Sequence, residues 1–198
     1  MSGQHYLTGE MIRKYVLKLM ENDRKITPFK YIQSEQKIHY PMRLTDGTEI
    51  QLKGFIDRLD EVNGTTRIID YKTGAKKGFD FKSIENLFDS SEEERRQAIM
   101  QVFMYAWMMQ QLPQAPPKGG IQPTLYYVRD FFTNDFDPVI SYGKEKAPVI
   151  DFSVYQDEFE DCMRYCLDQM FDPSIPFTQA IHTKYCAYCP FAGICGRN

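Results

Sequence analysis

The chain of 198 residues is long enough to form one domain with a hydrophobic core. Its hydrophobic fraction of 42% and charged fraction of 26% are typical of globular proteins. The sequence has no apolar run near the roughly 20 residues of a membrane-spanning helix, and it does not begin like a signal peptide. We therefore expect a cytoplasmic protein without a membrane partner.

The net charge of −3 excludes a strongly basic domain that binds nucleic acid through its overall charge. A local cluster departs from this average, because Lys72, Lys76, Lys77 and Lys82 lie within 11 residues. Such a cluster is either a solvated loop or a contact for nucleic acid. We take Lys76, Lys77 and Lys82 as candidate nucleic-acid contacts.

The first half of the chain is predicted to form one helix and three strands. Residues 8–22 carry apolar residues at helical spacing: Ile12, Tyr15, Val16, Leu19 and Met20. Residues 29–44, 48–60 and 65–72 are then predicted as successive strands, separated by the turn signals Asp46-Gly47 and Asn63-Gly64.

The second half is predicted to add two helices and one strand. Ser91 and Glu94 form a capping-box pattern before a helix that runs to about Leu112. The remaining elements are a strand at 121–128, an irregular excursion at 129–152 and a helix at 153–171. The order α-β-β-β-α-β-α predicts an α/β domain over residues 1–175, with a mixed sheet flanked by helices. Residues 176–198 form a Cys-rich tail that is expected to pack on this core.

The Asn63-Gly64 turn sets the register of the second and third strands. Asn-Gly favours a type I′ turn, because both central residues of that turn have positive φ. Counting outward pairs Val62 with Thr65, Leu59 with Ile68, Asp57 with Asp70, and Phe55 with Lys72. Directly opposed residues share one face of a sheet, so this register places two carboxylates side by side with a lysine close to them.

Two opposed carboxylates repel each other unless a cation lies between them. Mg²⁺ takes one or two carboxylates and otherwise keeps water and phosphate oxygens, and a nearby ammonium can orient a metal-bound water. The alternative is that Asp57 pairs with Arg58 or Arg67 while Asp70 is exposed. In the predicted register both arginines point to the opposite face.

The preceding turn leaves two possibilities open for a further ligand. With Asp46-Gly47 as a two-residue loop, Gln36 opposes Asp57. With a three-residue loop that ends at a left-handed Gly47, Leu44 pairs with Thr48 and Glu35 opposes Asp57. Glu35 is therefore a candidate metal ligand of second rank.

Gln101 and Tyr105 interrupt the otherwise apolar helix "AIMQVFMYAWMM" at i and i+4, so they share one of its faces. Buried polar groups need partners. Either this pair bonds to backbone groups in the core, or it points at the edge of the carboxylate site and holds substrate or water.

The segments "GFIDRLD", "IIDYKTG" and "QVFMY" together resemble the motifs of PD-(D/E)XK nucleases, in the branch of RecB, AddB and the CRISPR-adaptation nucleases. The resemblance implies a restriction-endonuclease-like αβββαβ core and covers roughly residues 8–195. It implies that Asp57, Asp70 and the backbone carbonyl of Tyr71 bind Mg²⁺ or Mn²⁺. It also implies that Lys72 is the catalytic lysine, that Gln101 and Tyr105 are accessory residues, and that the reaction is phosphodiester hydrolysis.

The tail resembles the cysteine segment of AddB-type iron–sulfur nucleases, with Cys186, Cys189 and Cys195 as its three thiolates. The family's fourth cysteine is absent, since no cysteine precedes Cys162, and His5 is a poor match for the family's early histidine. The interpretations are an incomplete [4Fe-4S] site, a zinc site with His182 as fourth ligand, or three reduced thiols. Cys162 and Cys166 lie on the apolar face of the last helix and are expected in the core.

The resemblance implies a deoxyribonuclease of exonuclease type that acts on single-stranded DNA in repair and recombination, beside a helicase domain or subunit. It suggests the C-terminal nuclease part of a longer protein or a divergent short form. Two alternatives stay open: a catalytically silent nucleic-acid-binding module, and a CRISPR-adaptation nuclease. The intact Asp57, Asp70 and Lys72 favour an enzyme.

Overall fold

The computed structural model describes residues 3–74, 78–89, 91, 96–113, 119–133 and 136–197. The predicted order of the main elements is confirmed. These are α1 (Gly3–Lys25), β1 (Lys30–Arg43), β2 (Glu49–Val62), β3 (Thr65–Lys72), α3 (Gln97–Gln110), β5 (Ile121–Tyr127) and α4 (Gln156–Phe171). Among the described residues, no helix is both long and apolar enough to cross a bilayer.

The four main strands form one mixed sheet in the order β1-β2-β3-β5. Strands β1, β2 and β3 are antiparallel neighbours, and β5 pairs with β3 in parallel. A parallel pair needs a crossover connection, and here the crossover between β3 and β5 contains α3. The sheet therefore brings the end of β3 and the helix that follows it to the same region of the molecule.

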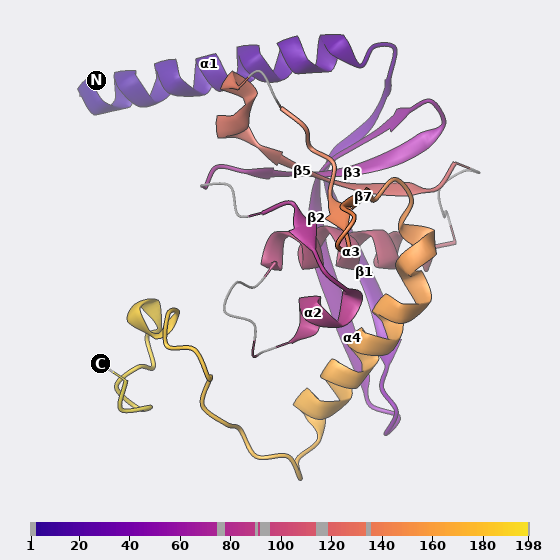
Figure 1. Ribbon diagram of the computed structural model, residues 1–198, viewed down its shortest axis with the longest axis vertical. Coiled ribbons are helices and arrows are strands. Elements are labelled where there is room, and N and C mark those ends of the chain that lie inside the picture. The colour runs from indigo at the N-terminus through magenta and orange to yellow at the C-terminus, as the bar shows by residue number, and fades with distance from the viewer. Residues whose placement is uncertain are drawn as a thin grey trace.

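Helices cover both faces of the sheet (Figure 1). On one face, α3 lies in the main core cluster with side chains of α4, and its Trp107, Phe103 and Val102 are almost completely buried. On the other face, α1 and the 3₁₀ helix η1 (Val128–Phe132) pack on a smaller cluster around Ile69 and Tyr126. The predicted mixed sheet flanked by helices is thus confirmed.

Several short elements were not predicted. They are β4 (Asp80–Phe81), α2 (Ile84–Phe88), β6 (Ser141–Tyr142) and β7 (Ala147–Pro148), of which the three strands form a second small sheet. The excursion at 129–152 is thus partly regular. Its strand β6 follows α3 in the sequence and pairs with β4, which precedes α3.

The predicted helix start at Ser91 is wrong. The helix α3 begins at Gln97, with Arg96 at its N-cap. The Arg96 side chain donates a hydrogen bond to the backbone carbonyl of Asp80 in β4. This tertiary contact, rather than a local capping box, fixes the entry of the chain into α3. Glu94, the other half of the proposed box, lies outside the described residues.

The apolar stripe predicted on the first helix is only partly covered. Tyr15 packs against Phe132, and Leu19 joins the cluster beneath α1. Ile12, Val16 and Met20 are about half exposed, at 54%, 48% and 58%. The helix therefore contacts the sheet along one edge of its apolar stripe.

Candidate active site

The β2–β3 hairpin turns as its sequence predicts. Asn63 and Gly64 have φ angles of 51° and 82°, as a type I′ turn requires. The ladder pairs Val62 with Thr65 and Leu59 with Ile68, so the predicted register is confirmed in this part of the hairpin.

The ladder ends sooner than predicted, at the pair Arg58–Ile69. Ile56 and Leu59 both belong to the main core cluster although they are three residues apart. Strict alternation would send them to opposite faces, so β2 is irregular at Asp57 and Arg58. Asp57 and Asp70 are thus not a ladder pair, and neither are Phe55 and Lys72.

Beyond the last backbone pair of the β2–β3 ladder, the side chain of Asp57 bonds to β3. Its Oδ2 accepts a hydrogen bond of 2.7 Å from the backbone N–H of Tyr71. Tyr71 lies between Asp70 and Lys72 in β3, so this bond fixes the backbone that carries both candidate residues. The alternative pairing of Asp57 with Arg58 or Arg67 does not occur among the described contacts.

Asp70 is a nearly buried carboxylate, with 3% of the residue exposed. Burial raises its pKa, and the nearby charge of Asp57 raises it further, against the opposing effect of the Lys72 ammonium. The structure therefore places Asp57 and Asp70 close enough for like-charge repulsion. One pKa raised in such a pair is a frequent feature of functional sites.

A polar chain connects Asp70 to α3. The Lys72 ammonium contacts Asp70 Oδ2 at 2.7 Å and donates a hydrogen bond of 2.6 Å to Gln101 Oε1. The Gln101 amide then donates to the Tyr105 hydroxyl at 2.8 Å. Of the two interpretations left open for Gln101 and Tyr105, the geometry favours the edge of the carboxylate site over bonding to core backbone.

Gly54, in β2, allows this chain to form. A Cβ atom placed on Gly54 would lie 2.3 Å from Cε1 of Tyr105, so only glycine lets the Tyr105 ring rest against β2. Gly54 lies in the segment "GFIDRLD", but nothing in the spacing of the sequence predicted that glycine is required at this position.

The local charges leave room for a divalent cation. Asp57 and Asp70 contribute two negative charges against the one positive charge of Lys72, and Asp70 Oδ2 is buried without a hydrogen bond of good geometry. Two carboxylates and a backbone carbonyl suit Mg²⁺, which keeps several of its waters. Asp57, Asp70 and the carbonyl of Tyr71 are therefore the residues that could hold it.

The pairs Ser34–Arg58 and Gln36–Ile56 put Glu35 across from Asp57, but no third acidic side chain joins Asp57 and Asp70 in a metal-binding group within the described part of the chain. Among the described residues, no three His, Cys, Asp or Glu side chains gather into a group that could hold a metal. The three-residue loop is correct, since Gly47 is left-handed and the Leu44 N–H donates to the Thr48 carbonyl. Glu35 itself is exposed, with a φ of 50°, and its role as a ligand stays a prediction.

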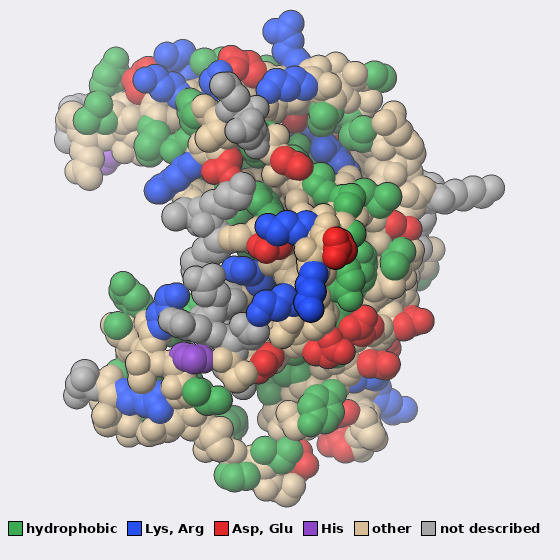
Figure 2. Space-filling view, in the orientation of Figure 1, with side chains coloured by type: hydrophobic (Ala, Val, Ile, Leu, Met, Phe, Trp, Pro, Cys, Tyr) green, Lys and Arg blue, Asp and Glu red, His purple; other side chains and the backbone are tan. Residues whose placement is uncertain are grey.

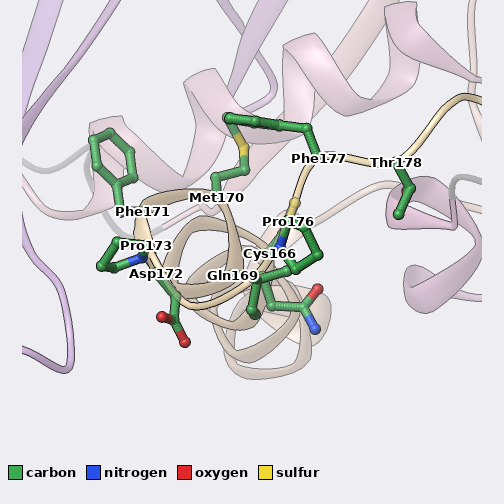
Figure 3. Close-up of a pocket in the computed structure, with 10 residues that line it drawn as sticks. Cys166, Gln169, Met170, Phe171, Asp172, Pro173, Pro176, Phe177 and Thr178 are labelled. Carbon is green, nitrogen blue, oxygen red and sulfur yellow. The ribbon is translucent and has the colours of Figure 1, made fainter.

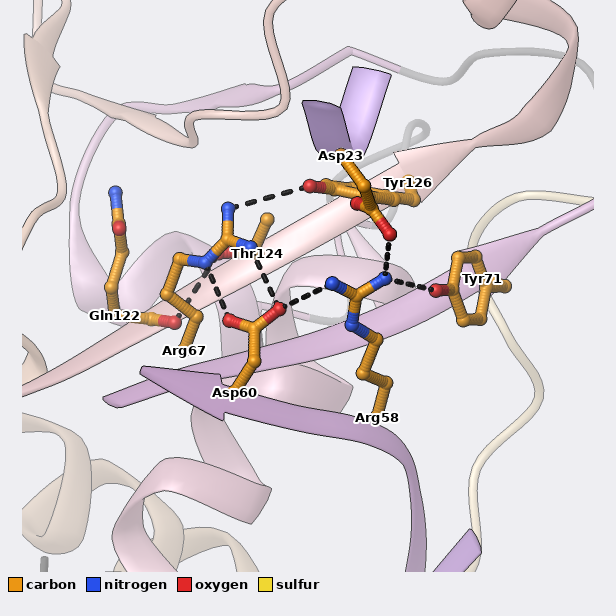
Figure 4. A network of polar contacts seen from close by, with 8 residues as sticks. All are labelled: Asp23, Arg58, Asp60, Arg67, Tyr71, Gln122, Thr124 and Tyr126. Carbon is orange, nitrogen blue, oxygen red and sulfur yellow. Dashed lines mark hydrogen bonds and ion pairs between the residues drawn. The ribbon is translucent and has the colours of Figure 1, made fainter. Parts of the chain in front are cut away.

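The opposite face of the same hairpin carries a buried ionic network that was not predicted (Figure 4). Asp60 is completely buried and pairs with both Arg67 and Arg58, at 2.7 Å each. Arg58 also pairs with Asp23 at the end of α1, and it donates to the Tyr71 hydroxyl. Burial alone would lower the pKa of Arg58, but the hydrogen bonds to Asp23 and Tyr71 raise it.

The network could have been suspected from "DRLD", because Arg58 and Asp60 are two residues apart in a strand and so share the face opposite to the core residue Leu59. It anchors the Tyr71 side chain on one face of β3, while Asp57 of the neighbouring strand accepts from the Tyr71 backbone N–H. Lys72 bonds to Gln101 of α3, so the short segment from Asp70 to Lys72 is held by three contacts.

The predicted nucleic-acid contacts are only partly described. Lys76 and Lys77 lie outside the described residues, and Lys82 is exposed next to β4. Figure 2 shows the molecule hollowed between the projecting end of α1 and the C-terminal tail, with Lys and Arg side chains gathered beside this hollow. The role of these three lysines stays a prediction.

The cysteines of the tail lie in an exposed segment. Cys186 is the first residue of the short 3₁₀ helix η3 (Cys186–Tyr188), Cys189 follows its end, and Cys189 and Cys195 are exposed. His182 bonds to the backbone carbonyl of Ser91. The iron–sulfur and zinc interpretations stay predictions, since no group of three ligands forms among the described residues.

A pocket of about 640 Å³ lies between the end of α4 and the beginning of the tail (Figure 3). It is lined by Cys166, Met170 and Phe177 among others, and by none of the candidate active-site residues. Cys162 packs against the main core as predicted, whereas Cys166 borders this pocket.

The model of the family described as PD-(D/E)XK nuclease superfamily matches residues 3–196. A search of curated proteins found no match. The family match spans every element of the sheet, the hairpin and α3, which together hold the candidate site. Nucleases of this superfamily typically use divalent metals such as Mg²⁺. The chain belongs to the PD-(D/E)XK nuclease superfamily.

Proposed function

We propose that the protein is a Mg²⁺- or Mn²⁺-dependent exodeoxyribonuclease of the RecB/AddB type that acts in DNA repair and recombination. In this proposal its substrate is single-stranded DNA delivered by a helicase domain or subunit, and the chain is the nuclease part of a longer protein. The observation that carries the catalytic part is the continuous chain from Asp70 through Lys72 and Gln101 to Tyr105, next to Asp57.

Each residue of this chain has a role that follows from its position. A divalent ion held by Asp57, Asp70 and the Tyr71 carbonyl would supply positive charge for the phosphate and lower the pKa of a water molecule. The Lys72 ammonium, which contacts Asp70 at 2.7 Å, would orient that water or the phosphate. Gln101 fixes the ammonium, and Tyr105 fixes the amide of Gln101. These two residues reduce the freedom of Lys72 before substrate binds.

The metal-free contacts also explain why Lys72 stays close to the carboxylates. Its ammonium offsets part of the charge of Asp70 at 2.7 Å, which limits the repulsion between the two aspartates. A catalytically silent nucleic-acid-binding module would keep such an ion pair without turnover. The same geometry therefore has to be tested by measuring the reaction itself.

The test is hydrolysis of single-stranded DNA labelled at one end or the other, with Mn²⁺ or Mg²⁺. We expect cleavage that EDTA stops and that Asp70→Asn and Lys72→Ala each reduce by at least about 100-fold, since even residues that support metal ligands typically cost 10- to 100-fold. Asp161→Ala, an exposed carboxylate on α4, is the matched control and should keep wild-type activity.

The pattern of products separates the alternatives. Release of nucleotides from one labelled end supports an exonuclease, and the label that is lost first gives its polarity. DNA bound but left intact by both wild type and Asp70→Asn would favour the silent module. Cleavage of circular single strands would exclude a requirement for an end, and equal cleavage of RNA would overturn the assignment to DNA.

A further inference from the structure

Strands β1 and β2 continue beyond the central sheet as a two-stranded ribbon. β2 pairs with β3 only from Arg58 onward, whereas its pairing with β1 extends to Glu49. Figure 1 shows the ribbon passing behind α3 and α4. One face of the ribbon packs on the core through Ile38, Met42 and Ile56, which are at most 3% exposed.

The opposite face of the ribbon is exposed and carries cationic and aromatic side chains. Lys37 is the cross-strand partner of Phe55, and His39 is the partner of Lys53. All four residues are exposed. We call these residues, Lys37, His39, Lys53 and Phe55, the outer ribbon face.

The positive charges of the outer ribbon face are not neutralised by the protein. Lys37 and Lys53 form no ion pair within the part of the chain that the structure describes. The Lys37 ammonium lies 5.9 Å from the centroid of the Phe55 ring, within the range of a cation–π contact. This contact holds a lysine beside the exposed ring without removing its charge.

The outer ribbon face and the candidate active site share strand β2. Phe55 precedes Asp57 by two residues of the same strand, which is about 7 Å at the rise of a β-strand. Phe55 is 54% exposed, so its ring is available to a ligand on the face of β2 opposite to the one where Gly54 meets Tyr105. Single exposed aromatics are common on protein surfaces, but this one lies beside Lys37 and precedes Asp57 by two residues in the strand.

We propose that the outer ribbon face binds single-stranded DNA, with a base stacked on Phe55 and phosphates at Lys37 and Lys53. This inference rests on the proposed nuclease function and names the surface that leads the strand to the site. Proteins that bind single strands combine a positively charged track with aromatic rings that stack on bases. In a duplex the base faces are covered by neighbouring bases, so a base can lie on Phe55 only when the strand is unpaired there.

The binding test uses a fluorescein-labelled dT15 oligonucleotide and fluorescence anisotropy in EDTA, where no hydrolysis occurs. Loss of one base–aromatic stack weakens binding roughly five- to 150-fold, so we expect a change in this range for Phe55→Ala. Phe55→Trp should retain wild-type affinity. The matched control is Phe177→Ala, because Phe177 is a fully exposed ring in the tail.

Two further measurements identify the contacts. A probe with abasic spacers in place of its bases removes stacking, so wild type and Phe55→Ala should bind it equally. The Lys37→Ala/Lys53→Ala double variant should lower the slope of log affinity against log salt by about 1.4, as expected for two phosphate contacts on a single strand. Lys184→Ala, an exposed lysine in the tail, should leave this slope unchanged.

The inference is overturned if Phe55→Ala binds dT15 as wild type does, if the abasic probe shows the same loss, or if a blunt duplex binds more tightly than dT15. These outcomes are independent of turnover. If the wild type cleaves DNA and Phe55→Ala binds dT15 as the wild type does, the proposed function stands and this binding surface is excluded. If Phe55→Ala weakens binding but the wild type hydrolyses no DNA, the binding surface stands and the proposed function is excluded.

Discussion

The two faces of the β2–β3 hairpin carry polar clusters that differ in charge balance. The buried network has two aspartates and two arginines, Asp23, Asp60, Arg58 and Arg67, and all four are paired within it. Among the described residues, the candidate active site has Asp57 and Asp70 against Lys72 alone. The charges of the buried network balance, whereas the described residues of the candidate active site carry one more negative than positive charge.

This difference separates a structural from a functional use of charge. Buried ions are tolerated when their partners are in place, so the network fixes α1 to the sheet and needs nothing from outside. The carboxylate pair is held in position by the Tyr71 N–H and by Lys72, yet its repulsion is only partly relieved. A site of this kind gains stability when it binds a cation.

The largest effect is expected from a variant that disrupts the buried ionic network. Asp60→Ala should lower the free energy of unfolding by about 3–5 kcal/mol, because it leaves two buried guanidinium groups without their shared carboxylate. Urea denaturation followed by circular dichroism measures it. Asp161→Ala, on the surface of α4, should change stability by less than about 0.5 kcal/mol. Equal effects of the two variants would contradict a structural role for the network.

The second-largest effect is expected when a divalent cation adds positive charge to the Asp57–Asp70 pair. Mn²⁺ or Mg²⁺ at 100 times its dissociation constant should stabilise the wild type by about 2.7 kcal/mol, which raises the midpoint of thermal unfolding by about 5–10 °C. Differential scanning fluorimetry measures this shift. The Asp57→Asn/Asp70→Asn double variant should show none. A shift of the same size in that variant would place the metal elsewhere.

A smaller effect is expected from a variant that disturbs the contact between β2 and Tyr105 of α3. Gly54→Ala should cost about 1–3 kcal/mol of stability, because the added methyl overlaps the Tyr105 ring. It should also slow hydrolysis, since Gln101 loses its fixed partner. Gly9→Ala, which meets open space in α1, should instead stabilise the protein by about 0.5–1 kcal/mol. In a Tyr105→Ala background the Gly54→Ala cost should vanish, and a cost that persists there excludes this explanation.

The smallest effect is a pH dependence without metal. Burial and Asp57 raise the pKa of Asp70 in the folded protein, so the folded state binds more protons than the unfolded state between the ordinary pKa and the raised one. The charge of Asp70 therefore reduces stability as pH rises through the raised pKa. Asp70→Asn should be more stable than wild type at neutral pH, with the difference disappearing near pH 4. A difference that is constant with pH would speak against this titration.

Local chemistry was sufficient to predict much of the hairpin. Asn63-Gly64 and Gly47 adopt the positive φ angles that their turns require, and the pairs near the β2–β3 turn follow directly. The order of the main strands and helices was also predictable, because hydrophobic periodicity records which face of each element is buried.

Counting residues outward from the turn stopped working at Asp57. There β2 leaves strict alternation, since Ile56 and Leu59 both pack into the same core. The start of α3 likewise follows from the contact between Arg96 and β4, which no local pattern contains. Short strands such as β6 depend on pairing partners about 60 residues away, so their sequence alone carries little signal.

By itself, the sequence determined the turns, the main elements and the residue types of the site, because these depend on neighbours within a few positions. Only the tertiary structure decided that Asp57 holds the backbone of Tyr71, that Gln101 reaches Lys72, and that Arg58 and Asp60 form a closed network. Except for the pair Arg58–Asp60, these contacts join residues of different strands and helices, and packing against a shared core fixes their distances.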